Sequence, residues 1–252
     1  MKKIIIGENI VKSFGEGDEK RNVLDDVSIE INEGEFVSVM GPSGSGKSTL
    51  IFSLSGMDTV DDGTVVFDGR GLSELKESEI AEIRRTQMGF VFQQPTLLKN
   101  LNILDNIMLP SMRDNRNETG KIAEKARSLM QTADIAELEK RDITQVSGGQ
   151  LQRAGICRAL MNSPKIIFAD EPTGALNSKS AQEIMDMFSK INAEGTTIML
   201  VTHGASIAAR TERILFMHDG KVVDDMSLPK YQSTDNNARI QKITARMQAM
   251  GV

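Results

Sequence analysis

The chain has 252 residues, of which 39% are hydrophobic and 26% are charged, and this composition suits a soluble globular protein with one large domain. A net charge of −5, no tryptophan and a single tyrosine disfavour a surface that binds nucleic acid or stacks bases, so we expect no nucleic-acid partner. Cys157 is the only cysteine, which excludes an internal disulfide.

Membrane-spanning and signal segments are not expected. The sequence has no run of 18 apolar residues, and its N-terminal apolar stretch is too short for a signal sequence. We therefore expect a cytoplasmic chain with no direct membrane span, held at a membrane only through another polypeptide.

The N-terminal third alternates short apolar runs with turn residues, which predicts strands. We expect turns at 15–18 and 32–34, a helix at 47–54, and strands at 3–10, 23–31, 35–40, 63–68 and 88–92.

Helical spacing dominates the middle of the chain, where we expect helices at 101–112, 120–132 and 147–161. The remainder then predicts a strand at 165–169, a helix at 180–192, a strand at 196–202 and a hairpin of 213–216 with 221–224. Because strands alternate with helices, the fold class is α/β with a mainly parallel core sheet.

One glycine-rich segment follows a predicted strand directly and opens a predicted helix. This phosphate loop consists of Gly41, Pro42, Ser43, Gly44, Ser45, Gly46, Lys47, Ser48 and Thr49. Its glycines let backbone N–H groups converge on phosphate oxygens, Lys47 can reach the β- and γ-phosphates, and the Ser48 hydroxyl can ligate Mg²⁺. A turn with a chance Lys-Ser is the alternative, and both flanking elements disfavour it. We expect ATP and Mg²⁺ as the ligands.

Two carboxylates, Asp170 and Glu171, follow the apolar strand 165–169. The carboxyl edge of a parallel sheet is where ligands of α/β proteins bind. An acidic helix cap is the alternative, but beside a phosphate loop we expect Asp170 to hold Mg²⁺ through its water shell and Glu171 to polarise the attacking water.

The segment Ser147, Gly148, Gly149 and Gln150 opens a helix, which would ordinarily indicate simple capping. Taken in order with the phosphate loop, Gln93, Asp170-Glu171 and His203, however, it resembles the ATP-binding-cassette (ABC) ATPases over about residues 3 to 225. The resemblance implies a P-loop NTPase cassette with an N-terminal antiparallel β-subdomain and an inserted helical subdomain. It also implies a head-to-tail homodimer, in which residues 147–150 of one chain complete the ATP site of the other.

The same resemblance implies a division of the chain. Residues 1–95 and 163–228 would form the core with its β-subdomain, 96–162 the helical subdomain, and 229–252 a helical tail.

The resemblance gives roles to three further residues. Gln93 matches a glutamine that touches Mg²⁺ and the attacking water, and His203 matches a switch histidine that contacts the γ-phosphate. Phe14 matches an aromatic ring that stacks on adenine, although a core phenylalanine is the alternative. Asn177 departs from the pattern because the family usually has aspartate there, and this puts communication between the two sites in doubt.

The segments 34–49, 88–93 and 168–176 resemble those of a bacterial subgroup that serves macrolide efflux, lipoprotein release and antimicrobial-peptide resistance. The segment 177–180 and the C-terminal extension most resemble the peptide-resistance (bacitracin-type) branch. A separate transmembrane permease would then be the partner, with the chain on the inner face of the cell membrane.

Apolar residues crowd the stretch after Gln93, and most of them should fill the helical subdomain, while a few could line a groove for a permease helix. They are Leu97, Leu98, Leu101, Ile103, Ile107, Met108 and Leu109.

The tail at 237–252 has apolar residues at helical spacing, and basic residues accompany them. It should dock on its own domain or on the dimer partner, and contact with anionic lipid or the permease is the alternative. The apolar residues are Ile240, Ile243, Met247 and Met250, and the basic ones are Arg239, Lys242 and Arg246.

Three other functions compete with transport. The first is a soluble ABC-type ATPase that does mechanical work on nucleic acid or in cell division. The DNA-repair and chromosome-organising ATPases insert long coiled coils between the phosphate loop and the segment that matches 147–150, and here only about a hundred residues separate Lys47 from Ser147. Translation-associated members would carry two cassettes in one chain. The third, an adenylate-kinase-like phosphotransferase, would not explain the presence of residues 147–150.

Overall fold

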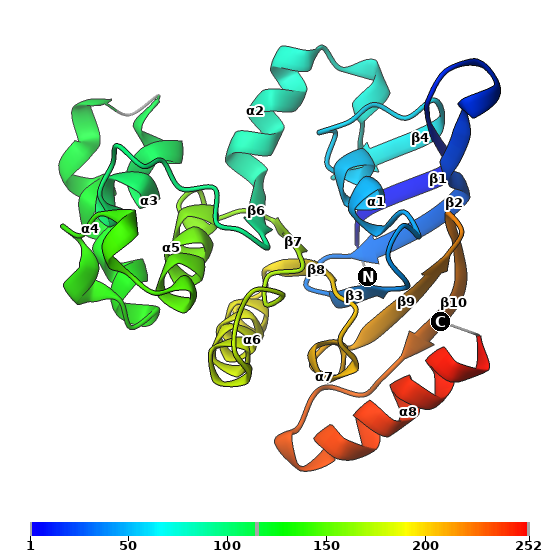
Figure 1. Ribbon diagram of the computed structural model, residues 1–252. Coiled ribbons are helices and arrows are strands. Elements are labelled where there is room, and N and C mark those ends of the chain that lie inside the picture. The colour runs from blue at the N-terminus through cyan, green and yellow to red at the C-terminus, as the bar shows by residue number, and fades with distance from the viewer. Residues whose placement is uncertain (1, 114–115, 251–252) are drawn as a thin grey trace.

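Two β-sheets and a separate group of helices make up the computed structural model, which describes residues 2–113 and 116–250 (Figure 1). The first sheet is antiparallel, in the order β2-β1-β4-β5. Its strands are β1 (Lys3–Phe14), β2 (Arg21–Asn32), β4 (Asp62–Phe67) and β5 (Arg70–Gly71).

The second sheet has the order β10-β9-β3-β8-β7-β6, and only β10 runs antiparallel to its neighbour. This confirms the α/β class, the mainly parallel core sheet and the antiparallel N-terminal sheet. The strands are β3 (Phe36–Met40), β6 (Met88–Phe92), β7 (Ile166–Asp170), β8 (Thr197–Val201), β9 (Arg213–His218) and β10 (Lys221–Ser227).

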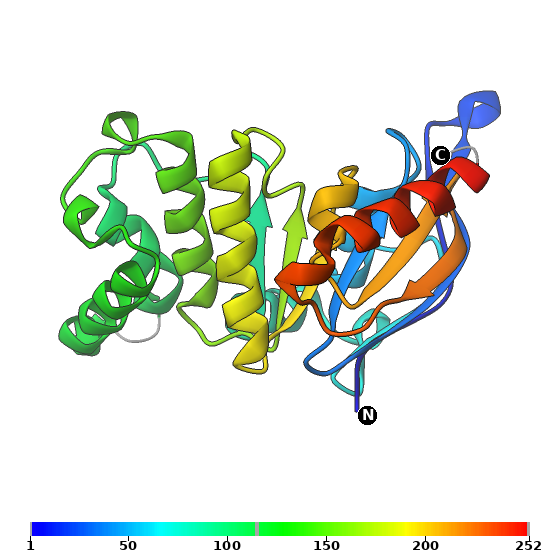
Figure 2. The same ribbon diagram turned by 90° about the horizontal axis from the view of Figure 1, so that it is seen from below.

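Helices lie on both sides of the core sheet and beyond its β6 edge (Figures 1 and 2). They are α1 (Lys47–Leu54), α2 (Glu77–Gln87), α3 (Ile103–Met112), α4 (Thr119–Thr132), α5 (Gly148–Leu160), α6 (Ser178–Ala193), α7 (Ala205–Ala208) and α8 (Asn236–Ala249). None of the helices within the described residues combines the length and the apolarity needed to cross a bilayer.

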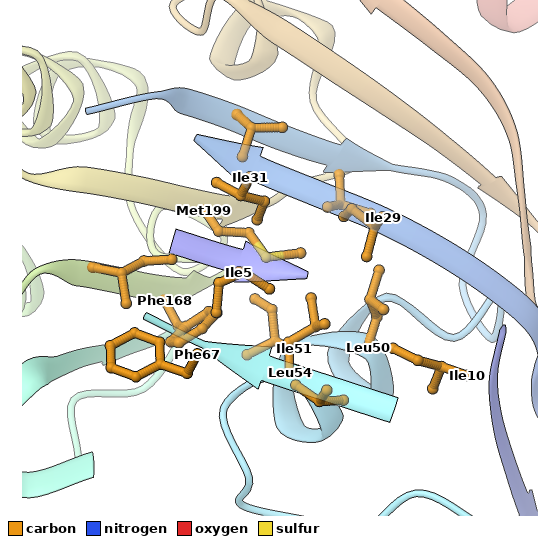
Figure 3. Close-up of a cluster of buried hydrophobic side chains, with 14 of the residues drawn as sticks. Ile5, Ile10, Ile29, Ile31, Leu50, Ile51, Leu54, Phe67, Phe168 and Met199 are labelled. Atoms are coloured by element: carbon orange, nitrogen blue, oxygen red, sulfur yellow. The ribbon is translucent and has the colours of Figure 1, made fainter. Parts of the chain in front are cut away.

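The main core lies where α1 packs between the two sheets (Figure 3). Every residue of β3 and β8 is buried, as expected for parallel strands that are covered on both faces. Leu50, Ile51 and Leu54 of α1 belong to the same cluster as Ile5 and Phe67 of the antiparallel sheet. This packing holds the start of α1, and therefore the phosphate loop, in a fixed place.

Helices α3, α4 and α5 share a core of their own. Ile103, Ile107 and Met108 are buried there, whereas Leu98 and Leu109 are 45% and 43% exposed. Most of the apolar residues after Gln93 therefore fill a core, and two of them reach the surface. Burial in this core raises the pKa of the Cys157 thiol to about 12, so the thiol is an inert core group.

Two helices were not predicted. Helix α2 has only Ile83 buried, so its apolar stripe is too weak to show helical periodicity. Helix α7 is a single turn of 4 residues.

The tail helix was predicted, and α8 buries Ile243 against the core sheet and α7, with Ile240, Met247 and Met250 packed around it. It docks on its own domain, and residues 251–252 of the predicted helix lie outside the described residues. Of the three basic residues that accompany this apolar stripe, Arg239 is only 5% exposed.

Candidate functional site

The phosphate loop connects β3 to α1 and lies closely against neighbouring backbone. A Cβ atom added to Gly41 would lie 2.2 Å from the Met217 carbonyl oxygen, and one added to Gly46 would lie 2.5 Å from that of Val23. Gly44 has a φ of 82°, which a residue with a side chain rarely adopts. Pro42, Ser43 and Gly44 form the exposed crown of the loop, where a ligand can approach the backbone.

Lys47 is the first residue of α1 and is only 7% exposed. Its ammonium donates to the carbonyl oxygens of Gly41 at 2.9 Å and Pro42 at 2.7 Å, so the side chain folds back along its own loop. Burial lowers the pKa of Lys47, and the charges of Glu171 and Asp170 oppose that shift. The ammonium therefore lies under the exposed residues 42–44. A bound phosphate could accept the hydrogen bonds that the ammonium now donates to the two carbonyl oxygens.

The Ser45 hydroxyl oxygen is also buried in this loop and has no hydrogen-bond partner among the described residues. A buried polar atom without a partner is costly, and a bound phosphate oxygen is a suitable partner. The loop's close backbone packing, its lysine and this orphaned hydroxyl together fit a polyphosphate.

Ser48 and Asp170 lie together at the carboxyl end of β7. The Ser48 hydroxyl donates to Asp170 Oδ1 at 3.0 Å, and burial raises the pKa of Asp170. Among the described residues, no three His, Cys, Asp or Glu side chains could hold a metal by themselves. A serine hydroxyl beside one carboxylate instead fits Mg²⁺, which takes most of its ligands from water and phosphate.

Glu171 and His203 meet beyond the ends of the adjacent strands β7 and β8. His203 Nδ1 lies 3.3 Å from Glu171 Oε2, and the histidine side chain is 68% exposed. Glu171 has a φ of 46°, a conformation that non-glycine residues adopt only at a cost and that is common at functional sites. The strained turn aims the carboxylate away from the strand and toward His203.

Gln93 approaches the same place from the end of β6. A Cβ atom added to Gly174 would lie 2.8 Å from Gln93 Nε2 and 3.2 Å from Glu171 Oε2. The amide of Gln93 and the carboxylate of Glu171 therefore converge over Gly174, and any side chain at that position would separate them.

Residues 147–150 form an exposed capping box at the start of α5. Gln150 N donates to Ser147 Oγ at 3.3 Å, and Ser147 N donates to Gln150 Oε1 at 2.9 Å. A Cβ atom added to Gly148 would lie 3.7 Å from Leu176, and one added to Gly149 would lie 3.1 Å from Ser180 Oγ. This helix start therefore lies beside the N-terminal end of α6.

Asn177 is itself the N-cap of α6 and accepts a hydrogen bond from Ser180 N at 2.9 Å. Asparagine caps a helix as well as aspartate does. The replacement of the family's aspartate therefore leaves this local structure intact.

Phe14 ends β1 and is 49% exposed, so the core alternative for it is wrong. The Lys12 ammonium lies 5.3 Å from the centre of its ring. The ring is thus a half-exposed aromatic group at the end of β1, with an ammonium near its centre.

The sequence does not indicate two side chains that hold the segment around Gln93, because a polar residue on a helix indicates nothing by itself. Gln152 of α5 is buried and donates to the Phe92 carbonyl at 2.9 Å, directly before Gln93. Arg158, two turns further, donates to the Thr96 carbonyl at 2.6 Å and to its hydroxyl at 2.9 Å. Helix α5 therefore binds the loop both before and after Gln93, at Phe92 and at Thr96.

The parallel sheet and its phosphate loop define a P-loop nucleoside triphosphatase. Sequence comparison identifies the family within this class: the model of the family described as "ABC transporter" matches residues 24–174 of the chain. The chain belongs to the ABC transporter family and is an ABC-type ATPase.

Relatives fall into two kinds. An uncharacterized ABC transporter ATP-binding protein of Bacillus subtilis, YknY, is 43% identical over 85% of this chain and 93% of its own length. The macrolide export ATP-binding/permease protein MacB of Pasteurella multocida is 39% identical over 96% of this chain. This chain spans only 37% of that longer protein.

Solved structures agree with the fold. A dimeric structure of MJ0796, described as a bacterial ABC transporter cassette, has a TM-score of 0.84 and 39% identity, and the match covers 90% of this chain and all of that one. A dimeric post-hydrolysis state of MJ0796 bound to ADP and Pi has a TM-score of 0.83 and 38% identity.

Proposed function

We propose that this chain hydrolyses ATP as a head-to-tail homodimer and that closure of the dimer drives a separate membrane permease in export. The position of residues 147–150 carries the proposal. They form an exposed helix start, and the neighbours of Gly148 and Gly149 are Leu176 and Ser180 near the start of α6 rather than residues of the phosphate loop. The MJ0796 structures, which are dimeric, support assembly of this chain as a dimer.

Each site residue has a role in this proposal. The phosphate loop holds the triphosphate, with Lys47 as countercharge, and Phe14 offers its exposed ring to the adenine. Glu171 accepts the proton of the attacking water, and His203 contacts the γ-phosphate and keeps Glu171 oriented. Ser48, Asp170 and Gln93 would hold Mg²⁺. When bound, Mg²⁺ would neutralise charge on the phosphates.

Complementation between two inactive variants tests the shared site. Gly148→Glu places a carboxylate where the partner's γ-phosphate would lie, and the space around Gly148 admits the side chain because Leu176 at 3.7 Å is its near neighbour. We expect this variant and Lys47→Ala each to lose ATP turnover. In a mixed dimer, the loop of the first and residues 147–150 of the second form one intact site, so mixing should restore a fraction of the turnover. Turnover that stays absent after mixing would contradict the shared site.

The finer assignments follow from the relatives and the motifs. MacB-type relatives join ATP-binding and permease parts in one chain, and we propose that here the permease is a separate polypeptide that holds this chain at the inner face of the membrane. Export is the direction of work, and resistance to antimicrobial peptides of the bacitracin type is the physiological task. In this proposal residues 1–95 and 163–228 form the motor core, 96–162 the helical subdomain and 229–252 the tail.

A groove between α2 and the helical group is the proposed permease contact. It is lined by apolar side chains, among them Phe90, Phe92 and Pro110, and by the basic side chains of Arg84 and Arg158. Exposed Met57 also lines this groove, and exposed Leu109 precedes Pro110. An apolar permease helix with an acidic residue fits this lining.

Charged substitutions at the groove are expected to separate hydrolysis from its coupling. Met57→Glu and Leu109→Glu should leave basal ATP turnover unchanged and abolish its stimulation by the co-purified permease. Val223→Glu on β10 is the matched control, because Val223 is 49% exposed and Met57 is 42% exposed. If stimulation survived in both groove variants, the permease would dock elsewhere.

A further inference from the structure

The C-terminal tail reaches the catalytic edge of the core sheet through α7. Helix α8 lies along β9 and β10 (Figures 1 and 2), and α7 stands between α8 and α6 in the view of Figure 1. Ile243 of α8 is fully buried in a cluster with Ala208 and Ala209 at the end of α7. Because α7 begins two residues after His203, the tail is packed against the segment that carries this histidine.

Arg239 makes this contact polar and specific. Its guanidinium is buried and donates to three backbone carbonyls: Ala209 at 2.6 Å, Thr211 at 2.6 Å and Pro229 at 2.7 Å. The carbonyls at the end of a helix have no partners within the helix, so Arg239 supplies a partner just where α7 ends. A planar guanidinium with three acceptors fixes their relative positions more closely than apolar packing does.

Tyr231 extends the contact to α6. The Arg210 guanidinium lies 4.3 Å from the centre of the Tyr231 ring, and that of Arg239 lies 5.6 Å from it. Arg210 also pairs with Asp186 on α6. Glu171 lies just before the turn that leads into α6, and His203 lies just before α7, so the tail connects the segments that follow both residues.

A cavity between α6, α7 and the tail joins these groups. Glu171 and His203 lie on its wall, and so do Arg210, Tyr231 and Asn236. The docked tail therefore lines the same cavity as Glu171 and His203.

We propose that the tail sets the position of the switch histidine: Arg239 clamps the end of α7 and thereby holds His203 against Glu171. Arg239 is a positioning residue, since it touches neither ATP nor the reacting atoms. The proposal rests on the role given to His203 in the proposed function. A tail released from α7 would leave ATP binding intact and slow hydrolysis.

The test is a double-mutant cycle in the full chain between Arg239 and His203. Arg239→Met keeps the apolar stem and removes the donors. A misplacement of about 1 Å can lower a rate by about 10²-fold, and since Arg239 acts on His203 only through α7, we expect a smaller fall in kcat of about tenfold. The KM for ATP should stay within about twofold of the wild-type value, because the phosphate loop is untouched. In the His203→Ala background, Arg239→Met should lower kcat no further. Arg239→Lys should recover part of the loss.

Arg246→Met is the matched control, since Arg246 lies on the same helix, is 54% exposed and pairs with Asp224 on β10. Its kcat should equal that of the wild type. If Arg239→Met does not fold, Tyr231→Leu takes its place in the same cycle, because it keeps apolar bulk and removes the ring between the two guanidiniums.

The outcomes distinguish a failure of the tail proposal from a failure of the role proposed for His203. Wild-type turnover by His203→Ala alone would overturn the role of His203 and the tail proposal with it. If His203→Ala lowers kcat and Arg239→Met lowers it again by the same factor as in the wild-type background, the tail proposal alone would be overturned. An unchanged kcat in a folded Arg239→Met would overturn the tail proposal alone as well.

Discussion

Replacing Glu171 by glutamine is expected to lower ATP turnover by a factor of about 10² or more, the usual contribution of a positioned general base. The amide keeps the size of the carboxylate and cannot accept the proton of the attacking water. The phosphate loop, Ser48 and Asp170 are untouched, so nucleotide binding should persist. Because hydrolysis would no longer reopen the dimer, the variant should accumulate as an ATP-bound dimer.

Two measurements check this expectation: steady-state phosphate release, and size-exclusion chromatography with and without ATP. Glu194→Gln is the control, because Glu194 is an exposed carboxylate at the far end of α6. It should turn over ATP like the wild type and remain in the same monomer–dimer distribution. Turnover near the wild-type rate in Glu171→Gln would contradict the assignment of Glu171.

The strands that carry this chemistry could be predicted because local signals and tertiary structure agree there. Strand β7 is an apolar run that stops at Asp170, and β3 stops at the glycines of the phosphate loop. Parallel strands bring such ends to one edge, so Ser48 and Asp170 could be expected together, and a hydrogen bond of 3.0 Å joins them. The antiparallel N-terminal sheet came from the family resemblance.

The sequence does not indicate contacts that depend on long-range packing. Arg239 has the helical spacing of a solvated basic face, and it is buried because three carbonyls from distant segments meet at its guanidinium. Lys12 is likewise buried within β1, where Asp58 lies 2.8 Å from its ammonium. In both cases the partner that makes burial of a charge tolerable lies far away in the sequence.

Replacing Lys47 by alanine is expected to weaken ATP binding by about 10²-fold or more, since a hydrogen bond to a charged group contributes up to roughly 3 kcal/mol. The loss has two physical sources. The phosphates lose the buried ammonium that faces them, and the carbonyls of Gly41 and Pro42 lose their donor, so the loop is no longer held open for the ligand.

Titration with a fluorescent ATP analogue measures this change, and Lys190→Ala is the matched control, because Lys190 is an exposed lysine on α6. The control should bind nucleotide with wild-type affinity.

Burial lowers the pKa of Lys47, and the negative charges of Asp170 and Glu171 favour its protonated form in the free protein. The phosphates would have the same effect in the complex. Lys47→Arg keeps a charge but cannot fold back on the two carbonyls with the same geometry, and it should restore only part of the affinity. Wild-type affinity in Lys47→Ala would show that the backbone of the loop alone holds the triphosphate.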